Sequence, residues 1–441
     1  MTTAAAAPAV PRAGEPAPPV PVATELVDAA WPAARSAAYR LASPLPPVRR
    51  SLAEAAGLVL SEPVRAQLPM PPDDVSAMDG WAVAGPPPWR VIGELLAGDQ
   101  SWDRLEDGTA VSIATGAPVS AGTYAVLRRE DGVGRSGLLH PRPGTGLEPG
   151  RHIRPAGEEA SSGEVLLPTG TRLTPPALGL AAAAGYDDVT VYRPATVRTF
   201  VLGDELLATG LARDGCIRDS LGPQLPGWLS ALGALPAPPA RLPDRRDALV
   251  DALASASHPL VPGAAAADVL VTTGGSSAGP VDHVQAAVRE LGGHLLIDGV
   301  VVHPGHPMAL AWLPGNVWLV ALPGNPLAAC AALLTLAQPL LHRLHGLPAP
   351  ATGRARLAVD VPSPGHTYRL VPARRTGATA TPLPHTGSGM LRGLTLADTV
   401  LAVPPGGAGA GATVEELTLP WCTTQPDFRV AAEHHDEGTD S

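Results

Sequence analysis

The sequence predicts a multidomain α/β plus β protein, and three observations support this fold class. Its 441 residues exceed what one compact core usually holds, so two to four domains are expected. From residue 191, strand-like and helix-like segments alternate, which is typical of a parallel sheet covered by helices. Two other stretches, 73–149 and 350–423, consist of short apolar runs between glycine and proline turns, which predicts small β domains.

The N-terminal half is expected to contain one interrupted helical domain. Residues 1–22 are rich in Ala and Pro, with no basic start and no continuous apolar core, so a disordered leader is expected. The segments "TELVDAAWPAARSAAYRLA" and "SLAEAAGLVL" predict helix in 23–60, and "TRLTPPALGLAAAAGYDDV" predicts helix near 171–186. Residues 23–72 and 150–190 then form a helical linker domain, into which the β domain 73–149 is inserted.

The α/β domain is expected to span 191–346. "ATVRTFVL", "ADVLVTT" and "VWLVAL" read as its strands, and "SLGPQLPGWLSALGA", "PDRRDALVDALASA", "PVDHVQAAVRELGG" and "PLAACAALLTLAQPLLHRLHG" as its helices. The last β domain follows at 350–423, and the polar segment 424–441 predicts a disordered tail.

Composition excludes several classes of function. The formal net charge is −10, which argues against a general nucleic-acid or anionic-membrane surface. Three cysteines lie far apart without CxxC spacing, so neither a disulfide framework nor a zinc ribbon is expected. No uninterrupted apolar run reaches membrane-spanning length, so a cytoplasmic protein is expected. The chain has no lysine, and all 31 of its Lys and Arg residues are arginine.

Three loops at strand ends of the α/β domain carry unusual residues. They are Gly203-Asp204-Glu205, the run from Gly274 to Gly279 followed by Asp282, and Pro323-Gly324-Asn325. Ligands bind at the carboxyl ends of parallel strands, and glycine lets the backbone approach a ligand closely. Glu205 and Asp282 in one crevice would suit a divalent cation. Any single loop reads more simply as a tight turn, with Asn325 capping the next helix; the three together favour a phosphate or nucleotide-like ligand.

Two further features leave alternatives open. Asp79-Gly80 and Thr115-Gly116 are either hairpin turns or a carboxylate and hydroxyl of a site, and their spacing does not separate these readings. The turn "HPGHP", from His303 to Pro307, could contact an anion or be an ordinary turn. A zinc site there is not expected, because the two histidines lack the helical i, i+4 spacing and have no nearby cysteine.

Six segments occur in the order found in one known family. They are "SAMDGWAV", "TGAPV", "IRPAGEEASSGEVLLPTGTRL", "GDEL", "TTGGSSAG..D" and "LPGNP". Over residues 23 to 420 the sequence resembles the molybdopterin molybdenumtransferases, or molybdenum insertases, and is similar to the E domain of gephyrin. Each segment alone is weak, but six in order are specific.

The resemblance implies four domains: the interrupted domain I, β domain II, a molybdopterin-binding α/β domain III and a small β barrel as domain IV. It implies a homodimer, with a crevice between domain III of one subunit and domain II of the other. The implied reaction takes molybdate and adenylated molybdopterin, cleaves the adenylyl phosphoanhydride, and gives molybdenum cofactor and AMP. The implied metal is Mg²⁺.

The resemblance also implies roles for individual residues. The catalytic residues are Asp79, Thr115, Glu205 and Asp282. The metal ligands are Asp79, Glu205, Asp244 and Asp282. The residues that bind the pterin substrate are Gly203, Asp204, Gly274, Gly275, Ser276, Ser277, Gly279, His303, His306, Pro323, Gly324, Asn325 and Ser388.

The sequence departs from the family pattern at several positions. The family's Lys-Pro-Gly-Lys-Pro is His303-Pro304-Gly305-His306-Pro307 here, and a family lysine is replaced by Gln285. An ordinary imidazole, with a pKa of about 6.5, is mostly neutral at pH 7. Losing charge-assisted bonds worth about 1.5–3 kcal/mol each predicts weaker binding of anions. The other departures are Val201-Leu202 for Ser-Thr, Asp219-Ser220-Leu221 for Asp-x-Asn, and His366 for an arginine.

These departures leave three hypotheses. The first is a working insertase, weakened by the loss of its lysines. The second is a divergent, non-catalytic paralogue that binds pterin or a partner protein through the same crevice. The third is a nucleotide or pyrophosphate hydrolase built on the α/β domain alone, which explains neither "SAMDG" nor "TGAPV".

Overall fold

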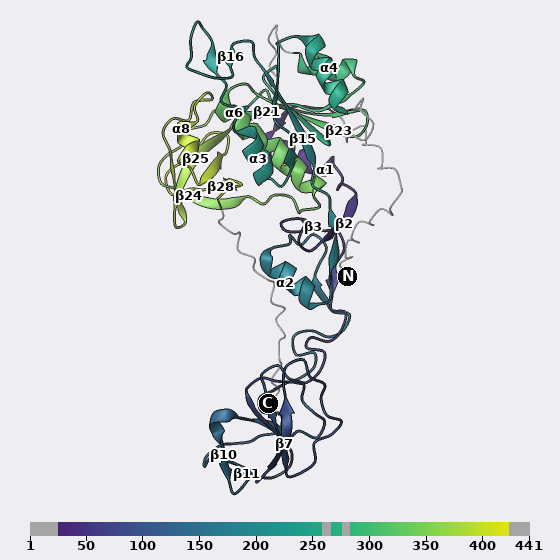
Figure 1. The fold of residues 1–441 in the computed structure, drawn as a ribbon. Coiled ribbons are helices and arrows are strands. Elements are labelled where there is room, and N and C mark those ends of the chain that lie inside the picture. Colours follow the sequence, from purple (N-terminus) through teal and green to yellow (C-terminus); the bar gives the residue numbers. More distant parts are fainter. Residues whose placement is uncertain (1–24, 258–265, 276–282, 423–441) are drawn as a thin grey trace, which may run out of the picture. The chain divides into compact units, whose positions relative to one another are not determined.

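The computed structural model describes residues 25–257, 266–275 and 283–422, and its contacts divide the chain into two compact units (Figure 1). Within the described residues, the first unit comprises the chain up to Val48 and from Tyr192 onward, and the second comprises Arg49–Val191. The predicted site residues Ser276, Ser277, Gly279 and Asp282 lie outside the described residues.

A mixed sheet forms the centre of the first unit, with the strand order β18-β15-β20-β23-β22-β21. The first four strands are parallel, as expected, but β22 runs antiparallel to both of its neighbours. β19 pairs with β15, and β1 pairs with β21. The strands are β1 (Leu26–Ala30), β15 (Thr196–Leu202), β18 (Leu235–Pro236), β19 (Ala240–Leu242), β20 (Val269–Thr273), β21 (His294–His303), β22 (Ala309–Leu313) and β23 (Val317–Leu322).

The antiparallel strands correct the expectation of a purely parallel sheet. β21 and β22 are joined by a short turn, and such a connection permits only antiparallel pairing. Two antiparallel steps give β21 the direction of β23. The carboxyl ends of β15, β20, β23 and β21 therefore share one edge of the sheet, and the loops that follow them are neighbours. A separate pair, β16 (Leu206–Leu207) and β17 (Ile217–Arg218), lies beyond the end of β15.

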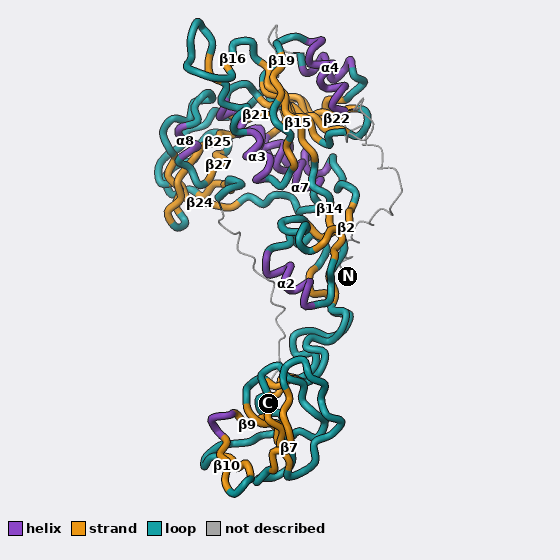
Figure 2. Tube along the Cα trace, in the orientation of Figure 1, coloured by secondary structure: helices purple, strands orange, loops and turns teal. Residues whose placement is uncertain are grey.

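Helices cover both faces of this sheet (Figure 2). Val269 and Val271 of β20 belong to the hydrophobic cluster that contains α1, α3 and the long helix after β23, whereas Leu270 belongs to the cluster of α4 and α5. Alternate residues of a strand point to opposite faces, which explains this division. The helices are α1 (Trp31–Arg40), α3 (Leu225–Ala231), α4 (Arg246–Ser257), α5 (Val284–Glu290), α6 (Pro326–Ala332), the π-helical η2 (Leu333–Ala337) and α7 (Gln338–Leu344).

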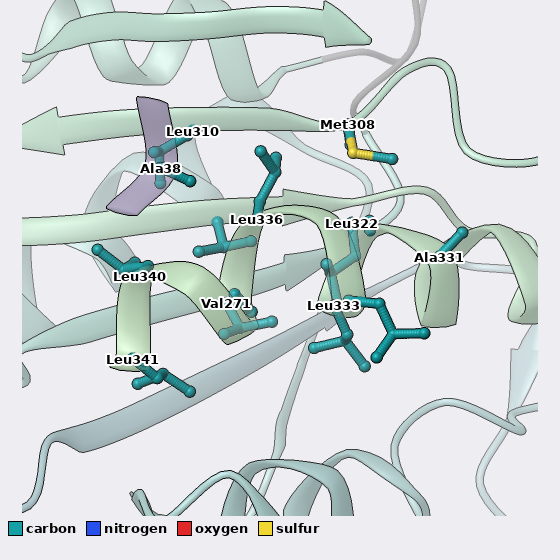
Figure 3. Packing of buried hydrophobic residues seen from close by; sticks show 14 of the residues in the cluster. Ala38, Val271, Met308, Leu310, Leu322, Ala331, Leu333, Leu336, Leu340 and Leu341 are labelled. Atoms are coloured by element: carbon teal, nitrogen blue, oxygen red, sulfur yellow. The ribbon is translucent and has the colours of Figure 1, made fainter. Parts of the chain in front are cut away.

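The long helix formed by α6, η2 and α7 is the central helix of this core. Leu333, Leu336 and Leu340 pack in one cluster with Val271 and Leu322 of the sheet (Figure 3). Of the described helices, this is the one that is long and apolar enough to cross a membrane by length and composition, over Pro326–Leu344. However, 83% of its apolar window is buried within the protein. This is therefore a core helix, and its apolar surface is accounted for by packing.

A buried arginine satisfies a backbone group at the π-helical turn. Gln338 donates its backbone N–H to the Leu333 carbonyl, five residues back. By the same spacing the Leu334 carbonyl would need the N–H of Pro339, which proline lacks. The guanidinium of Arg35 on α1, which is 7% exposed, donates to that Leu334 carbonyl instead. Burial lowers the pKa of Arg35 to about 10, so the group remains charged at neutral pH.

The C-terminal residues form the expected small barrel. Pairings run from β25 to β26, β24, β28 and β27 and return to β25, which closes the sheet. β21 pairs with β25, and barrel residues such as Leu370 and Leu417 belong to the same hydrophobic cluster as the long helix. The barrel elements are β24 (Gly353–Leu357), β25 (Tyr368–Thr376), β26 (Thr379–Pro382), α8 (Arg392–Thr395), β27 (Thr399–Val403) and β28 (Thr413–Thr418).

The second unit is built almost entirely of short strands. A four-stranded sheet in the order β7-β8-β6-β9 forms one core, and smaller sheets surround it. Its elements are β2 (Pro47–Ser51), β3 (Val59–Leu60), β4 (Val64–Arg65), β5 (Val75–Ser76), β6 (Gly80–Val83), β7 (Arg90–Leu95), β8 (Thr109–Ile113), β9 (Ala125–Arg128), η1 (Arg129–Asp131), β10 (Gly132–Arg135), β11 (Leu138–Pro141), β12 (Ile153–Arg154), β13 (Val165–Leu167), α2 (Pro175–Ala183) and β14 (Asp188–Tyr192).

The predicted helix over 51–60 is wrong, and strands rather than helices make up most of the regular structure in 49–72 and 150–190. The segment 51–60 forms turns and β3, which joins β14 and β2 in a three-stranded sheet. Gly57 adopts a φ of +76°, a conformation outside the right-handed helix, and Val59 and Leu60 bury their side chains in the sheet. Of the predicted helices in the interrupted domain, only α1 and α2 form, and α1 packs in the core of the first unit.

Candidate functional site

The loop after β15 places a carboxylate close to a strained backbone position. Gly203 has a φ of +140°, and a Cβ there would lie 2.7 Å from Leu206 Cγ and 3.0 Å from Glu205 Oε2. The Glu205 side chain therefore folds back over Gly203, although the residue remains exposed to solvent. Only glycine fits this turn, as the sequence predicted for a tight strand-end loop.

Asp204 and Asp244 join the ends of β15 and β19 through reciprocal hydrogen bonds. The Asp204 N–H donates to Asp244 Oδ2 at 3.3 Å, and the Asp244 N–H donates to Asp204 Oδ1 at the same distance. Each carboxylate accepts one long main-chain bond and keeps its other lone pairs. Two acidic side chains thus lie together beside Glu205, in the loop region where the resemblance puts a cation.

The loops after β20 and β23 touch each other. Gly274 and Gly275 have φ values of 78° and 63°, and the Gly274 N–H donates to the Leu322 carbonyl at 3.0 Å. A Cβ on Gly324 would lie 3.6 Å from Gly274 Cα. A Cβ on Gly274 would lie 3.3 Å from the Leu202 carbonyl at the end of β15. The three predicted loops are therefore one continuous backbone surface.

Ser388 of the barrel lies at the start of α6, next to these loops. Its carbonyl accepts the N–H groups of Leu327 and Ala328, at 2.8 and 3.3 Å. The expectation that the Asn325 side chain caps this helix is wrong, because α6 has no side-chain cap. Instead Asn325 Oδ1 lies 3.6 Å from the Cβ position of Gly389 and is exposed beside Pro323 and Gly324. A main-chain cap from a distant loop leaves no pattern that the sequence could show.

The turn "HPGHP" follows β21 and packs against α6. A Cβ on Gly305 would lie 3.2 Å from the Ala328 carbonyl and 3.4 Å from Ala331 Cβ. His303 and His306 are both exposed. His306 Nε2 lies 2.9 Å from Oδ1 of Asp28 on β1, a partner that sequence analysis did not identify. The turn thus borders the loop region, but one of its histidines is paired with a carboxylate.

Gln285 is also held by a carboxylate. Its Nε2 donates to both oxygens of Asp298 on β21, at 2.9 Å each. Asp219, in the position of the family's Asp-x-Asn pattern, accepts the N–H groups of Leu221 and Gly222 at 3.0 and 2.9 Å. It therefore fixes the bend that precedes α3.

In the second unit, Asp79 and Thr115 are direct partners. Asp79 Oδ1 accepts both the Thr115 N–H at 2.8 Å and the Thr115 hydroxyl at 2.9 Å. These two bonds are the main reason that the pKa of Asp79 lies below its ordinary value. Gly80 is required next to it, because a Cβ there would lie 1.9 Å from the Leu127 carbonyl. The sequence predicts both residues in turns, and in the structure the two residues are hydrogen-bonded to each other.

Metal-binding clusters and cavities are two other features that could mark a functional site. Among the described residues, no group of three or more His, Cys, Asp or Glu residues is arranged to hold a metal ion. Two cavities of about 690 and 380 Å³ lie in the second unit, lined by residues such as Met70, Arg154 and Tyr186. None of the predicted site residues lines either cavity, so we base the site on the loop geometry.

Three family models match this chain in order. Residues 27–185 match the model of the MoeA N-terminal region (domains I and II), residues 198–343 that of a probable molybdopterin binding domain, and residues 354–419 that of the MoeA C-terminal region (domain IV). A molybdopterin molybdenumtransferase from Haemophilus influenzae is 32% identical over 67% of this chain and 72% of its own length. One from Bacillus subtilis is 30% identical over 82% of this chain and 87% of its own length.

Solved structures show the same fold. Two crystal structures of the molybdopterin biosynthesis protein MoeA from Pyrococcus horikoshii cover 89% and 88% of this chain, and 98% and 99% of their own chains. Their TM-scores are 0.73 and 0.72, at 25% and 23% sequence identity. With three matching regions in the family's order and relatives of this similarity, the chain belongs to the molybdopterin molybdenumtransferase family of molybdenum cofactor biosynthesis.

Proposed function

We propose that this protein inserts molybdate into adenylated molybdopterin and releases AMP. The observation that carries the proposal is the shared edge of the sheet, where the loops after β15, β20 and β23 adjoin. The loop after β15 carries Asp204 and Glu205, and Asp204 is hydrogen-bonded to Asp244 in the loop after β19. Glycine backbone N–H groups suit phosphate oxygens, and carboxylates suit the cation that accompanies them. An adenylated, phosphorylated pterin carries such phosphates, and a divalent cation would accompany them.

The acidic residues fit Mg²⁺ by the chemistry of their donors. Mg²⁺ prefers oxygen ligands and usually takes one or two carboxylates together with substrate phosphates. Asp244 uses one oxygen for a main-chain bond and has lone pairs left, and Glu205 is exposed. Glu205, Asp244 and, from its motif match, Asp282 would hold the metal, which would supply positive charge next to the substrate phosphates. Asp282 itself lies outside the described residues.

We also propose that the chain acts as a cytoplasmic homodimer. In the dimer that the family resemblance implies, Asp79 and Thr115 serve the crevice of a second copy. The Thr115 bonds keep Asp79 ionised, which suits a metal ligand or a group that positions a cationic partner. The backbone N–H groups of Gly275 and Gly324 bind the substrate phosphates, whereas the Gly274 N–H already donates to the Leu322 carbonyl and shapes the loop.

The direct test is AMP release. Purified protein with adenylated molybdopterin, molybdate and Mg²⁺ is expected to release AMP in proportion to the molybdenum cofactor formed. Glu205→Gln provides the inactive comparison, and Asp251→Asn, an exposed carboxylate on α4, provides the matched control. No AMP above the Glu205→Gln level at any pH from 5.5 to 8 would contradict the proposal.

The alternative is a non-catalytic paralogue that binds pterin or a partner protein through the same crevice. Its motivation is specific: three family lysine positions hold His303, His306 and Gln285, and two of these side chains bond to carboxylates. His303→Lys/His306→Lys separates the alternatives. A gain from no activity to measurable AMP release supports the paralogue, whereas full activity in the unmodified protein excludes it.

A further inference from the structure

Three residues that are far apart in sequence form a compact cluster at the edge of the α/β sheet. Asp28 on β1 has a φ of 46°, and Gly299 on β21 has a φ of 79°. The strand pairing joins Val27 to Asp298 and Ala29 to Val300, so Asp28 lies opposite Gly299. A Cβ on Gly299 would lie 2.7 Å from Asp28 Oδ1 and 3.7 Å from His306 Cε1. The Asp28 carboxylate and the His306 ring therefore occupy the space that a side chain at position 299 would fill.

The contact fixes one nitrogen of the imidazole and leaves the other available. His306 Nε2 lies 2.9 Å from Asp28 Oδ1, and an ionised carboxylate can only accept, so Nε2 is protonated and donates to Asp28. Nδ1 makes no hydrogen bond to any residue in the described part of the chain. The side chains are 58% and 61% exposed, so a ligand can reach them.

The cluster borders the proposed crevice. His306 follows Gly305, whose Cβ position lies 3.2 Å from the Ala328 carbonyl in the first turn of α6. The same turn of α6 is held by the Ser388 carbonyl and follows Pro323-Gly324-Asn325. The nearby Asp298 carboxylate is already engaged by Gln285, so Asp28 is the acidic partner of His306.

We propose that Asp28 is a positioning residue of this crevice: its carboxylate accepts from Nε2–H and orients a His306 imidazolium, protonated on both nitrogens, so that Nδ1–H meets the anionic substrate of the proposed reaction. The inference rests on that proposed function. A lysine ammonium is a point charge on a flexible stem and needs no such support. An imidazole has two distinct nitrogens, so a fixed acceptor on one determines what the other presents. Asp28, Gly299 and His306 together substitute for the family's second motif lysine.

The experiment compares Asp28→Asn in three backgrounds: the unmodified protein, His306→Gln and His306→Lys. In the unmodified protein, Asp28→Asn is expected to raise KM for adenylated molybdopterin about tenfold and to change kcat little, since it removes one charge-assisted contact. The same change is expected to have no effect after His306→Gln, and none after His306→Lys. Asp28→Glu restores part of the affinity. Asp251→Asn, which removes a charge from the same unit without touching His306, leaves KM unchanged.

A second readout does not depend on catalysis. In ¹⁵N NMR spectra, assigned by comparison with His306→Gln, Nε2 of the His306 ring in the unmodified protein is expected to be protonated and hydrogen-bonded, and Asp28→Asn changes that signature. Equal losses from Asp28→Asn with and without His306, or an unchanged ring signature, would overturn the inference. Absence of AMP release from the unmodified protein refutes the proposed function instead, and the ring signature still tests the pair.

Discussion

The two units present their acidic site residues in different ways. In the first unit, Asp204 and Asp244 each accept a single main-chain bond of 3.3 Å. In the second, one oxygen of Asp79 accepts two shorter bonds, of 2.8 and 2.9 Å, both from Thr115. The first arrangement leaves carboxylates that can adjust to a ligand, whereas the second fixes one carboxylate before any ligand arrives. The first unit therefore presents adjustable carboxylates, and the second presents one carboxylate in a fixed position.

The largest expected effect is on catalysis. Asp79→Asn and Glu205→Gln are each expected to lower kcat for AMP release by roughly 100-fold or more, as for other preorganised charges at reacting phosphates. Because each variant damages a different unit, mixing the two inactive proteins tests whether a crevice uses two subunits. With free exchange of subunits, about a quarter of the unmodified activity is expected to return, since half of the dimers regain one intact crevice. If AMP release does not recover although the subunits exchange, each crevice takes its Asp79 and its Glu205 from the same subunit.

The next effect concerns the backbone of the second unit. Gly80→Ala is expected to lower the free energy of unfolding of that unit by roughly 3 kcal/mol or more, because its Cβ would overlap the Leu127 carbonyl. Gly116→Ala is the matched control, since its Cβ meets nothing within 4 Å and only the positive φ is strained, at a cost of about 1–2 kcal/mol. Hydrogen exchange measured in increasing urea assigns each loss to a unit. A loss of protection in the first unit would contradict the division.

A comparable perturbation can be confined to the first unit. Arg35→Ala is expected to lower its free energy of unfolding by about 2–4 kcal/mol, because the buried Leu334 carbonyl loses its donor. Pro339→Ala supplies a backbone N–H to that carbonyl, so the double variant should lose less than Arg35→Ala alone. Urea unfolding of the four proteins measures this coupling. Additive losses would show that Arg35 acts through packing rather than through the carbonyl.

The smallest effect is on a titration. Thr115→Val removes the hydroxyl donor, so the pKa of Asp79 is expected to rise toward its ordinary value while the Thr115 N–H bond remains. A lowered pKa means that the stabilisation is complete above the ordinary value and is lost as the pH falls through the lowered one. Carboxyl ¹³C shifts of Asp79 follow the change, and Thr123→Val, whose hydroxyl bonds to Ser120, serves as the control. An unchanged titration midpoint would show that the main-chain bond alone sets the pKa.

Sequence predicts what depends on local pattern and on the rules of parallel sheets. The loops at Gly203, Gly274 and Gly324 were expected together because parallel strands end at one edge, and the structure brings them into contact. The barrel was expected from its turns and from the family resemblance, and it closes. The prediction of a helix over 51–60 was wrong. Apolar periodicity does not reveal that Gly57 has a positive φ, or that Val59 and Leu60 pair with strands distant in sequence.

Contacts between distant segments could not be predicted. Asp28 and His306 are 278 residues apart, and Arg35 and Leu334 are 299 apart. Neither pair has a spacing that a single sequence could reveal. The Ser388 carbonyl that caps α6 is a main-chain group, so any residue in the right place could supply it. A substrate-binding role for Ser388 could therefore be predicted only from the family motif, and its main-chain contact with α6 is seen only in the structure.

The barrel cannot be treated as an attachment that could be removed. It continues the edge of the central sheet through β21 and β25, shares the hydrophobic cluster of the long helix, and supplies the carbonyl that caps the start of α6. A chain shortened before residue 350 would leave an open sheet edge, an uncovered apolar surface and two unsatisfied N–H groups beside the crevice. The α/β domain and the barrel therefore have to be kept together in shortened or hybrid variants, and a barrel taken from a relative has to place a main-chain carbonyl at the start of α6.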